Sequence, residues 1–234
     1  FDFKDPKGVN NVVFKTDAPL EAINGSANDI TGTVTFDPEN PAATKGKIVV
    51  AAASMTVPNG MMKQHMHGNQ WLDVAAHPQI TFDVKSIKNA KTDGDKTTAE
   101  AVGTFSLKGV SKELTIPVTL TYLKDKLSQR VPNLKGDLLV IRSTFSIKRS
   151  DCNINAGKGE DKVADDIELT LSIAGASAKS LARVEDADGR GEIDAHERTF
   201  HRQPQRAFAI DARFAGLRLL RRKICVMIVV RHRL

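Results

Sequence analysis

The chain has 234 residues, of which 41% are hydrophobic and only 5% aromatic, and it carries a net charge of +6. This composition suffices for a globular core built mainly from aliphatic side chains. No segment approaches the roughly 18 consecutive apolar residues of a membrane-spanning helix. Two cysteines, Cys152 and Cys225, are too few for a disulfide framework.

The positive charge is concentrated near the C-terminus. Residues 181–234 contain 11 arginines and a single lysine, whereas lysine is the main basic residue before them. This change predicts a boundary near Ser180, between a domain over residues 1–179 and an Arg-rich extension over residues 180–234. The chain starts at Phe1 rather than at a methionine, which is expected after removal of a signal peptide or at a truncated reading frame.

The first half of the domain contains four segments whose apolar residues alternate, as in strands with one buried face. They span residues 11–15, 31–37, 47–57 and 79–88. Val34 and Phe36 share one face of the second segment. The inward set predicted for the third segment is Val49, Ala51, Ala53, Met55 and Val57.

The clearest pattern follows, over residues 99–123. Apolar or small residues alternate through 99–107 and again through 114–122, with a short glycine-containing connection at residues 108–112 between them. This arrangement predicts an antiparallel hairpin with one dry face. Two further alternating segments, 138–147 and 167–173, complete a set of eight predicted strands.

Eight antiparallel strands can bury their apolar faces in a sandwich or in a closed barrel. A barrel of about eight strands is just wide enough for side chains to fill it or for one ligand. Small residues predicted on the inner face leave room for a long, thin apolar guest: Ala51, Ala53, Ala99, Ala101 and Gly103. We therefore predict an all-β, eight-stranded antiparallel barrel.

Residues 58–78 interrupt the strands with a segment rich in methionine. Met62, His65 and Met66 lie at helical spacing, and Trp71 and Leu72 follow. We expect a short helical lid over one end of the barrel. Two interpretations stay open: a plug in which methionines fill gaps in the core, or the wall of a ligand entrance.

Six short motifs, in order along the chain, resemble the YceI-like polyisoprenoid-binding family over residues 1–176. They occupy residues 32–41, 54–56, 63–73, 77–82, 103–112 and 145–151. The resemblance implies a lipocalin-like barrel, periplasmic or secreted in bacteria, that holds an isoprenoid quinone or polyprenyl lipid and has no enzymatic activity. It implies no other cofactor, and no nucleic-acid binding by the barrel.

We expect the ligand to contact inward strand residues and lid residues rather than one polar group. The predicted ligand-binding residues are Val34, Phe36, Ala53, Met55, Met62, Met66, Trp71, Leu72, Phe82, Ala101, Phe105 and Phe145. The partner is an amphiphilic isoprenoid lipid, and the protein is expected to be a monomer or a homodimer.

The alternative function is a metal-dependent hydrolase. His65, His67 and His77 lie within thirteen residues, with Asp73 nearby, and three imidazoles can hold zinc with an open fourth position. In a helical segment, however, side chains two positions apart, such as those of His65 and His67, point in different directions. No nucleophile elbow or phosphate-binding glycine loop appears in the sequence.

The C-terminal extension carries two further patterns. Segment 186–197, from Asp186 to Glu197, fits a twelve-residue calcium loop except that Arg190 replaces an oxygen ligand. Residues 213–233 mix basic clusters with an apolar run. They are interpreted either as a basic arm for nucleic acid or anionic lipid, or as an appended, disordered or out-of-frame sequence that contributes little to the barrel.

Overall fold

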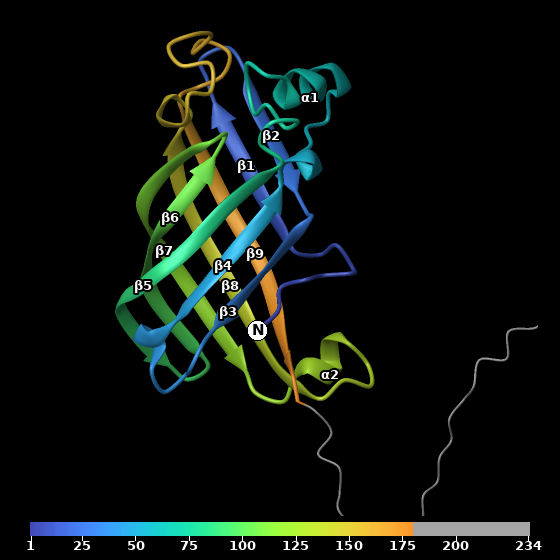
Figure 1. The fold of residues 1–234 in the computed structure, drawn as a ribbon, viewed down its shortest axis with the longest axis vertical. Coiled ribbons are helices and arrows are strands. Elements are labelled where there is room, and N and C mark those ends of the chain that lie inside the picture. Colours follow the sequence, from blue (N-terminus) through green and yellow to red (C-terminus); the bar gives the residue numbers. More distant parts are fainter. Residues whose placement is uncertain (180–234) are drawn as a thin grey trace, which may run out of the picture. The chain divides into compact units, whose positions relative to one another are not determined.

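The structure is a computed structural model that describes residues 1–179, and Figure 1 shows its strands and helices. The strands in this range are β1 (Asn11–Asp17), β2 (Ala22–Ala27), β3 (Ile30–Thr35), β4 (Lys45–Ala51), β5 (Gln79–Asp93), β6 (Lys96–Leu107), β7 (Val110–Leu123), β8 (Gly136–Lys148) and β9 (Asp166–Ala178). The boundary predicted at Ser180, the calcium-loop-like segment 186–197 and the basic segment 213–233 lie outside the described residues.

Short helices lie at both ends of the strands (Figure 1). Helix α1 (Gly60–His67) lies at one end, called the lid end below, and α2 (Leu127–Arg130) lies at the other, called the α2 end. Single 3-10 turns are η1 (Pro41–Ala43), η2 (Ala52–Ser54) and η3 (Ser150–Cys152). Neither α-helix within residues 1–179 has the length and hydrophobicity needed to cross a bilayer.

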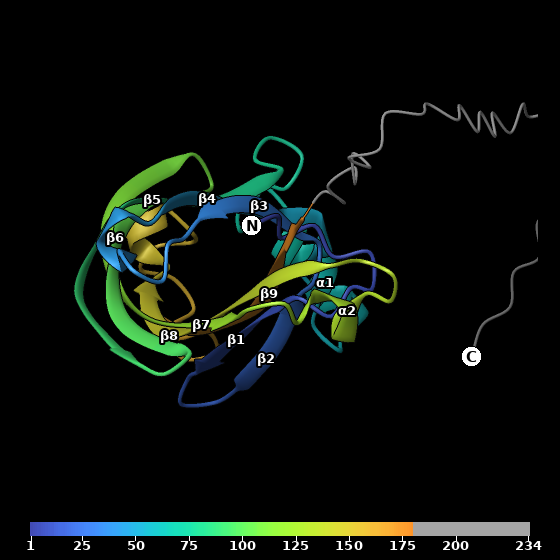
Figure 2. The ribbon, with the colours of Figure 1, turned by 90° about the horizontal axis from the view of Figure 1, so that it is seen from below.

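The strands form one antiparallel sheet in the order β2-β1-β9-β8-β7-β6-β5-β4-β3, and the end-on view in Figure 2 shows it curling round into a barrel. The predicted all-β antiparallel barrel is confirmed, with nine strands instead of eight. The additional strand is β2, whose sequence AINGSA lacks an alternation of large apolar residues. Pairing with β1, from Val12↔Ala27 to Asp17↔Ala22, holds it in the sheet.

The hairpin predicted over residues 99–123 is present as β6 and β7, which pair from Lys96↔Thr121 to Leu107↔Val110. Its turn consists of two residues, Lys108 and Gly109, with φ angles of 50° and 75°. Two successive positive φ angles are typical of the tight turn that matches the twist of antiparallel strands. The turn therefore fixes the register that turns the apolar residues of both strands to the interior.

Short bridges close the barrel between its edge strands, β2 and β3. Asp2 bridges Thr33 of β3 and Ala176 of β9, so the N-terminal segment fills the gap between these two strands. On the lid side, Ser26 of β2 bridges Thr56, which follows η2. These bridges give each edge strand a partner over part of its length and so shorten the exposed edges of the sheet.

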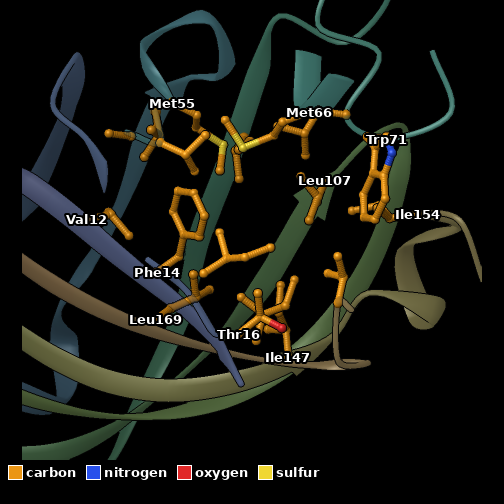
Figure 3. Close-up of a pocket in the computed structure, with 18 of the residues that line it drawn as sticks. Val12, Phe14, Thr16, Met55, Met66, Trp71, Leu107, Ile147, Ile154 and Leu169 are labelled. Atoms are coloured by element: carbon orange, nitrogen blue, oxygen red, sulfur yellow. The ribbon is translucent and has the colours of Figure 1, made fainter. Parts of the chain in front are cut away.

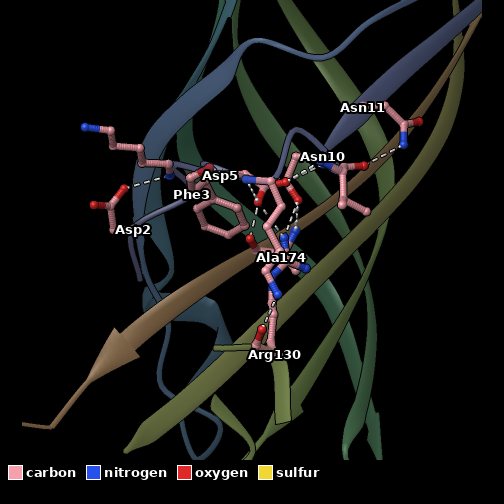
Figure 4. Close-up of polar contacts among 10 residues, drawn as sticks. Asp2, Phe3, Asp5, Asn10, Asn11, Arg130 and Ala174 are labelled. Carbon is pink, nitrogen blue, oxygen red and sulfur yellow. Dashed lines mark hydrogen bonds and ion pairs between the residues drawn. The ribbon is translucent and has the colours of Figure 1, made fainter. Parts of the chain in front are cut away.

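A buried polar network fastens the N-terminal segment to the barrel (Figure 4). The Asp5 carboxylate, which is 4% exposed, pairs with the Arg130 guanidinium at 3.2 Å and accepts a hydrogen bond from the backbone N–H of Asn10 at 2.7 Å. The Asn10 amide in turn donates to the carbonyl oxygens of Phe3 and Ala174. The network satisfies the polar groups that closing the barrel would otherwise bury unpaired.

The strand predicted over residues 47–57 is shorter than predicted, and within the strand the inward face is the opposite one, whereas Met55 and Val57, which follow it, face the interior. Strand β4 ends at Ala51, and the 3-10 turn η2 follows. Ile48 and Val50 face the interior, whereas Ala53 is exposed. The prediction was wrong because successive apolar residues in this segment occupy both faces, so that alternation does not determine the phase.

Side chains fill the α2 half of the barrel. Its fully or nearly fully buried members include Phe3, Ile87, Ala99, Ala101, Val118, Leu120, Leu139, Ile141 and Ile173. At the α2 end, the ring of Tyr122 packs against those of Phe1 and Phe36 with centroid distances of 6.2 Å. The small residues Ala99 and Ala101, predicted to leave room for a guest, therefore lie within a packed core.

Candidate ligand-binding cavity

The lid half of the barrel contains a cavity of about 400 Å³, shown in Figure 3. Inward residues of eight strands form most of its wall: Val12, Phe14, Ile23, Ile48, Val50, Ile80, Phe82, Phe105, Leu107, Ile116, Phe145, Ile147, Leu169 and Leu171. They face the interior because they occupy alternate positions of strands whose other face is exposed. The wall is therefore almost entirely hydrocarbon.

The register of the sheet places large side chains opposite one another across this wall. Leu169 of β9 pairs with Phe14 of β1 on one side and with Phe145 of β8 on the other. Phe14 also pairs with Gly25 of β2, and a Cβ atom at Gly25 would overlap the Phe14 ring. Glycine at this position thus leaves the space that the ring occupies.

The lid covers one end of the cavity. Helix α1 begins at the N-cap Asn59, whose side-chain oxygen accepts a hydrogen bond from the Met62 N–H at 3.0 Å, as is typical of helix starts. Met62 and Met66 from the helix and Trp71 after it line the cavity, with Met66 and Trp71 labelled in Figure 3. The sequence left two interpretations of this segment open, a plug over the core or part of the cavity wall. In the structure the lid covers the core and also lines the cavity.

The loop between β8 and β9 forms the remaining wall through Ile154, Gly159, Lys162 and Val163. Arg149 organises this loop from a fully buried position. Its guanidinium donates hydrogen bonds to the carbonyl oxygens of Ile154, Asn155, Lys158, Val163 and Ala164. All five N–H donors of the side chain are thereby used on backbone acceptors, so the positive charge is buried without a carboxylate contact.

Asp165 anchors the far end of the same loop. Hydrogen bonds from the Ser150 hydroxyl and backbone N–H, at 2.7 and 2.9 Å, lower the pKa of this carboxyl below its ordinary value. Cys152 lies in the same loop, at the end of η3, where burial raises the pKa of its thiol. A protonated buried thiol behaves as a small apolar group, so we assign Cys152 to packing.

Few ionisable side chains touch the cavity, and they come from its rim. Glu21 lies at the start of β2, His65 on α1 and Lys162 on the β8–β9 loop, and all three are exposed. These three elements meet at the lid end. The rim can therefore contact a polar group while the interior contacts hydrocarbon.

The structure brings together eight of the twelve predicted ligand-binding residues on the cavity wall: Met55, Met62, Met66, Trp71, Leu72, Phe82, Phe105 and Phe145. The other four lie elsewhere. Val34, Phe36 and Ala101 belong to the packed core of the α2 half, and Ala53 is exposed on η2. Ligand contact by any of the twelve residues stays a prediction.

The three histidines of the alternative metal site occupy separate positions. His65 lines the cavity, the His67 Nε2 lies 2.8 Å from the Met55 carbonyl oxygen, and the His77 ring lies against Gly109 in the β6–β7 turn. Within residues 1–179, no group of three or more His, Cys, Asp or Glu side chains is arranged to hold a metal ion.

Sequence reasoning missed Arg149 and the wall residues of its loop. Ile154 and Val163 show no periodicity that marks them as inward-facing, because they lie in irregular backbone. One signal was available: residues 1–179 contain only three arginines, Arg130, Arg142 and Arg149, among many lysines. Arginine is favoured where several fixed acceptors must be satisfied at once, and Arg130 and Arg149 both occupy such sites.

Fold and cavity together define a lipocalin-like antiparallel barrel with a lidded interior cavity. The family model of the YceI-like domain matches residues 7–175, and the chain belongs to this family. A UPF0312 protein of Yersinia pestis (strain Pestoides F) is 32% identical over 155 residues, which cover 66% of this chain and 74% of the relative. A UPF0312 protein of Yersinia enterocolitica is 31% identical over the same coverage.

Solved structures share the fold at lower identity. BcnA from Burkholderia cenocepacia superposes with a TM-score of 0.59 at 22% identity, covering 71% of this chain and 96% of BcnA. A polyisoprenoid-binding domain from Saccharophagus degradans gives a TM-score of 0.54 at 10% identity, covering 74% of this chain and 95% of that domain. The predicted resemblance to the YceI-like family is confirmed.

Proposed function

We propose that the protein binds the hydrocarbon tail of an isoprenoid-type lipid, such as a polyprenyl lipid or an isoprenoid quinone, in the barrel cavity. It acts as a carrier or sequestering protein without a catalytic step. The observation that carries this proposal is the apolar cavity of about 400 Å³ in a barrel that is otherwise filled. The polyisoprenoid-binding description of the Saccharophagus degradans domain with the same fold supports it.

The chemistry of the wall favours such a ligand. Each CH₂ group moved from water into an apolar cavity gains about 0.8 kcal/mol, and carbon atoms dominate the surface between Phe14, Phe82 and Leu169. Polar groups at Glu21, His65 and Lys162 lie at the rim. An amphiphile with its tail inside and its head group at the rim satisfies both surfaces.

We further propose that the protein acts in the periplasm or outside the cell, as a monomer or homodimer that holds one lipid in each barrel. The support is family resemblance together with the insolubility of a free polyprenyl tail in water. Fractionation of cells that carry the complete gene, with antibody detection of the protein, tests the location. Recovery of the protein solely in the cytoplasm would contradict it.

Organic extraction of freshly purified protein, followed by mass spectrometry, tests the ligand class. We expect an isoprenoid lipid in roughly molar proportion to the protein. Leu169→Glu places a charge in the centre of the cavity wall and should reduce the recovered lipid at least tenfold. Thr170→Glu changes the adjacent, exposed position of the same strand and should leave it unchanged. Equal lipid content in both variants would contradict the proposal.

A further inference from the structure

We propose that the cavity has a closed floor that limits the bound tail to about three isoprene units, with Ile48 and Ile116 setting the limit. This inference rests on the proposed function and makes it more specific. Longer tails bind through the same inner segment, and their remaining units leave through the rim. The cavity therefore contacts an inner segment of defined length, and isoprene units beyond that segment add little to the affinity.

The burial of inward residues changes along single strands. On β8, inward residues Phe145 and Ile147 are half-buried, whereas Ile141, further along the same face, is 7% exposed. On β9, Leu171 is half-buried, whereas Ile173, the next inward residue, is 1% exposed. Because the alternation is unbroken, the inner face itself changes from an open wall to a packed core at this level.

Two isoleucines lie where the cavity meets the packed core. Ile48 of β4 and Ile116 of β7 line the cavity and also belong to the buried core cluster. Beyond them the core contains Ile141 and Ile173, and the fully buried ring of Phe3. The floor therefore consists of branched side chains that other side chains support from the α2 half.

The volume of the cavity sets the length of tail that fits inside it. A cavity of 150 Å³ engineered in another protein accommodates benzene, which corresponds to about 25 Å³ for each carbon atom. The cavity of about 400 Å³ therefore holds about 16 carbon atoms by the same measure. This number corresponds to about three isoprene units of five carbons each.

A closed floor has a measurable consequence. Each additional carbon inside an apolar cavity raises affinity by about fourfold before losses of chain entropy, whereas a carbon left outside the rim adds little. The dissociation constant should therefore fall as the chain lengthens and stop falling once the cavity is full. Trp71, the only tryptophan of the chain, lines the cavity and provides a fluorescence signal for binding.

The test is a titration of the full chain with prenols of two, three, four and six isoprene units, below the concentration at which each prenol scatters light. We expect the dissociation constant to fall more than tenfold from two to three units and to change less than threefold from three to six. A constant that continues to fall through six units would overturn the closed floor. Absence of binding at every length would overturn the proposed function as well.

Two substitutions at Ile116 should move the limit in opposite directions. Ile116→Ala deepens the cavity, so four units should bind at least threefold more tightly than three. Ile116→Phe raises the floor, so three units should lose at least tenfold in affinity while two units are unaffected. Ile87→Ala removes the same atoms from a core isoleucine that does not line the cavity and should leave the limit at three. Unchanged length dependence in both Ile116 variants would overturn the assignment.

Discussion

The guanidinium carbon of Arg149 lies 5.8 Å from the centre of the Trp71 ring. Arg149 holds the β8–β9 loop through five hydrogen bonds to backbone carbonyl oxygens, and Trp71 belongs to the lid. A cation placed over an indole ring is attracted by about 0.5 to 2 kcal/mol. One buried side chain thus connects two segments of the cavity wall that are far apart in the sequence.

Replacement of Arg149 by lysine should destabilise the protein by about 2 to 4 kcal/mol, because an ammonium group has three donors for five buried acceptors. The fluorescence maximum of Trp71 should shift as the stacked cation moves. Denaturant unfolding followed by fluorescence measures both effects. Arg142→Lys changes an exposed arginine of the adjoining strand and should stay within about 0.5 kcal/mol of wild type. Equal effects of the two substitutions would exclude the role assigned to Arg149.

A methyl group at Gly25 should distort the cavity wall, because its Cβ would overlap the Phe14 ring. We expect Gly25→Ala to cost about 1 to 3 kcal/mol, as is usual for overpacking, and to weaken prenol binding. Gly60→Ala is the matched control, since a Cβ at Gly60 meets no atom within 4 Å and alanine favours helix. Thermal unfolding of both variants distinguishes steric overlap from a general effect of losing glycine.

The Asp5 network predicts how stability depends on pH. Burial by itself raises the pKa of Asp5, but hydrogen bonds from the backbone N–H groups of Asn10 and Val9, together with the charge of Arg130, outweigh it and lower the pKa below its ordinary value. A lowered folded-state pKa stabilises the protein above the unfolded-state pKa of about 3.9, and this contribution is lost as the pH falls through the folded-state value.

Asp5→Asn should therefore be about 1 to 3 kcal/mol less stable than wild type at pH 7, and the difference should narrow as the pH falls below about 4. Urea unfolding at pH 7 and pH 3 measures it. Val9→Ala, at an exposed position of the same segment, should show a difference from wild type that does not depend on pH. A pH-independent difference for Asp5→Asn would show that its carboxylate does not stabilise the fold by charge.

The N-cap of the lid should control local opening of α1. Asn59→Ala removes the acceptor for the Met62 N–H and should cost the helix about 1 kcal/mol. Because α1 has no fully buried residue, we expect the backbone amides of 60–67 to exchange hydrogen about fivefold faster while global stability changes little. Asn59→Asp keeps an equivalent cap and should restore slow exchange. Unchanged exchange in the alanine variant would show that tertiary contacts alone hold the lid.

The strands that could be predicted from the sequence are those in which large apolar residues alternate with polar ones. Hairpin β6–β7 was predictable because its alternation and its Lys108-Gly109 turn are local. Strand β2 was not, since its sequence AINGSA has no alternation of large apolar residues and carries Gly25 where the Phe14 ring needs space. The phase of β4 was wrong because a continuous apolar run fits either face.

The candidate site likewise contains residues that alternation identifies and residues that it does not. Phe82, Phe105 and Phe145 could be predicted as wall residues from alternation alone. Val34 and Phe36 alternate equally well, but periodicity carries no information about how deep in the barrel a residue lies. Ile154 lies on the wall in irregular backbone that Arg149 holds by donating to its carbonyl oxygen, and that contact depends on the tertiary structure.

The bridges that Asp2 forms with Thr33 and Ala176 constrain the order in which the protein can fold. Residues near the start of the chain complete the wall only when a segment more than 170 positions later is available. Contacts between such distant positions are slow to form because a long loop must close first. The N-terminal segment therefore stays without its final partner until β9 is available. We expect the barrel to close only after nearly all of β9 has been synthesised.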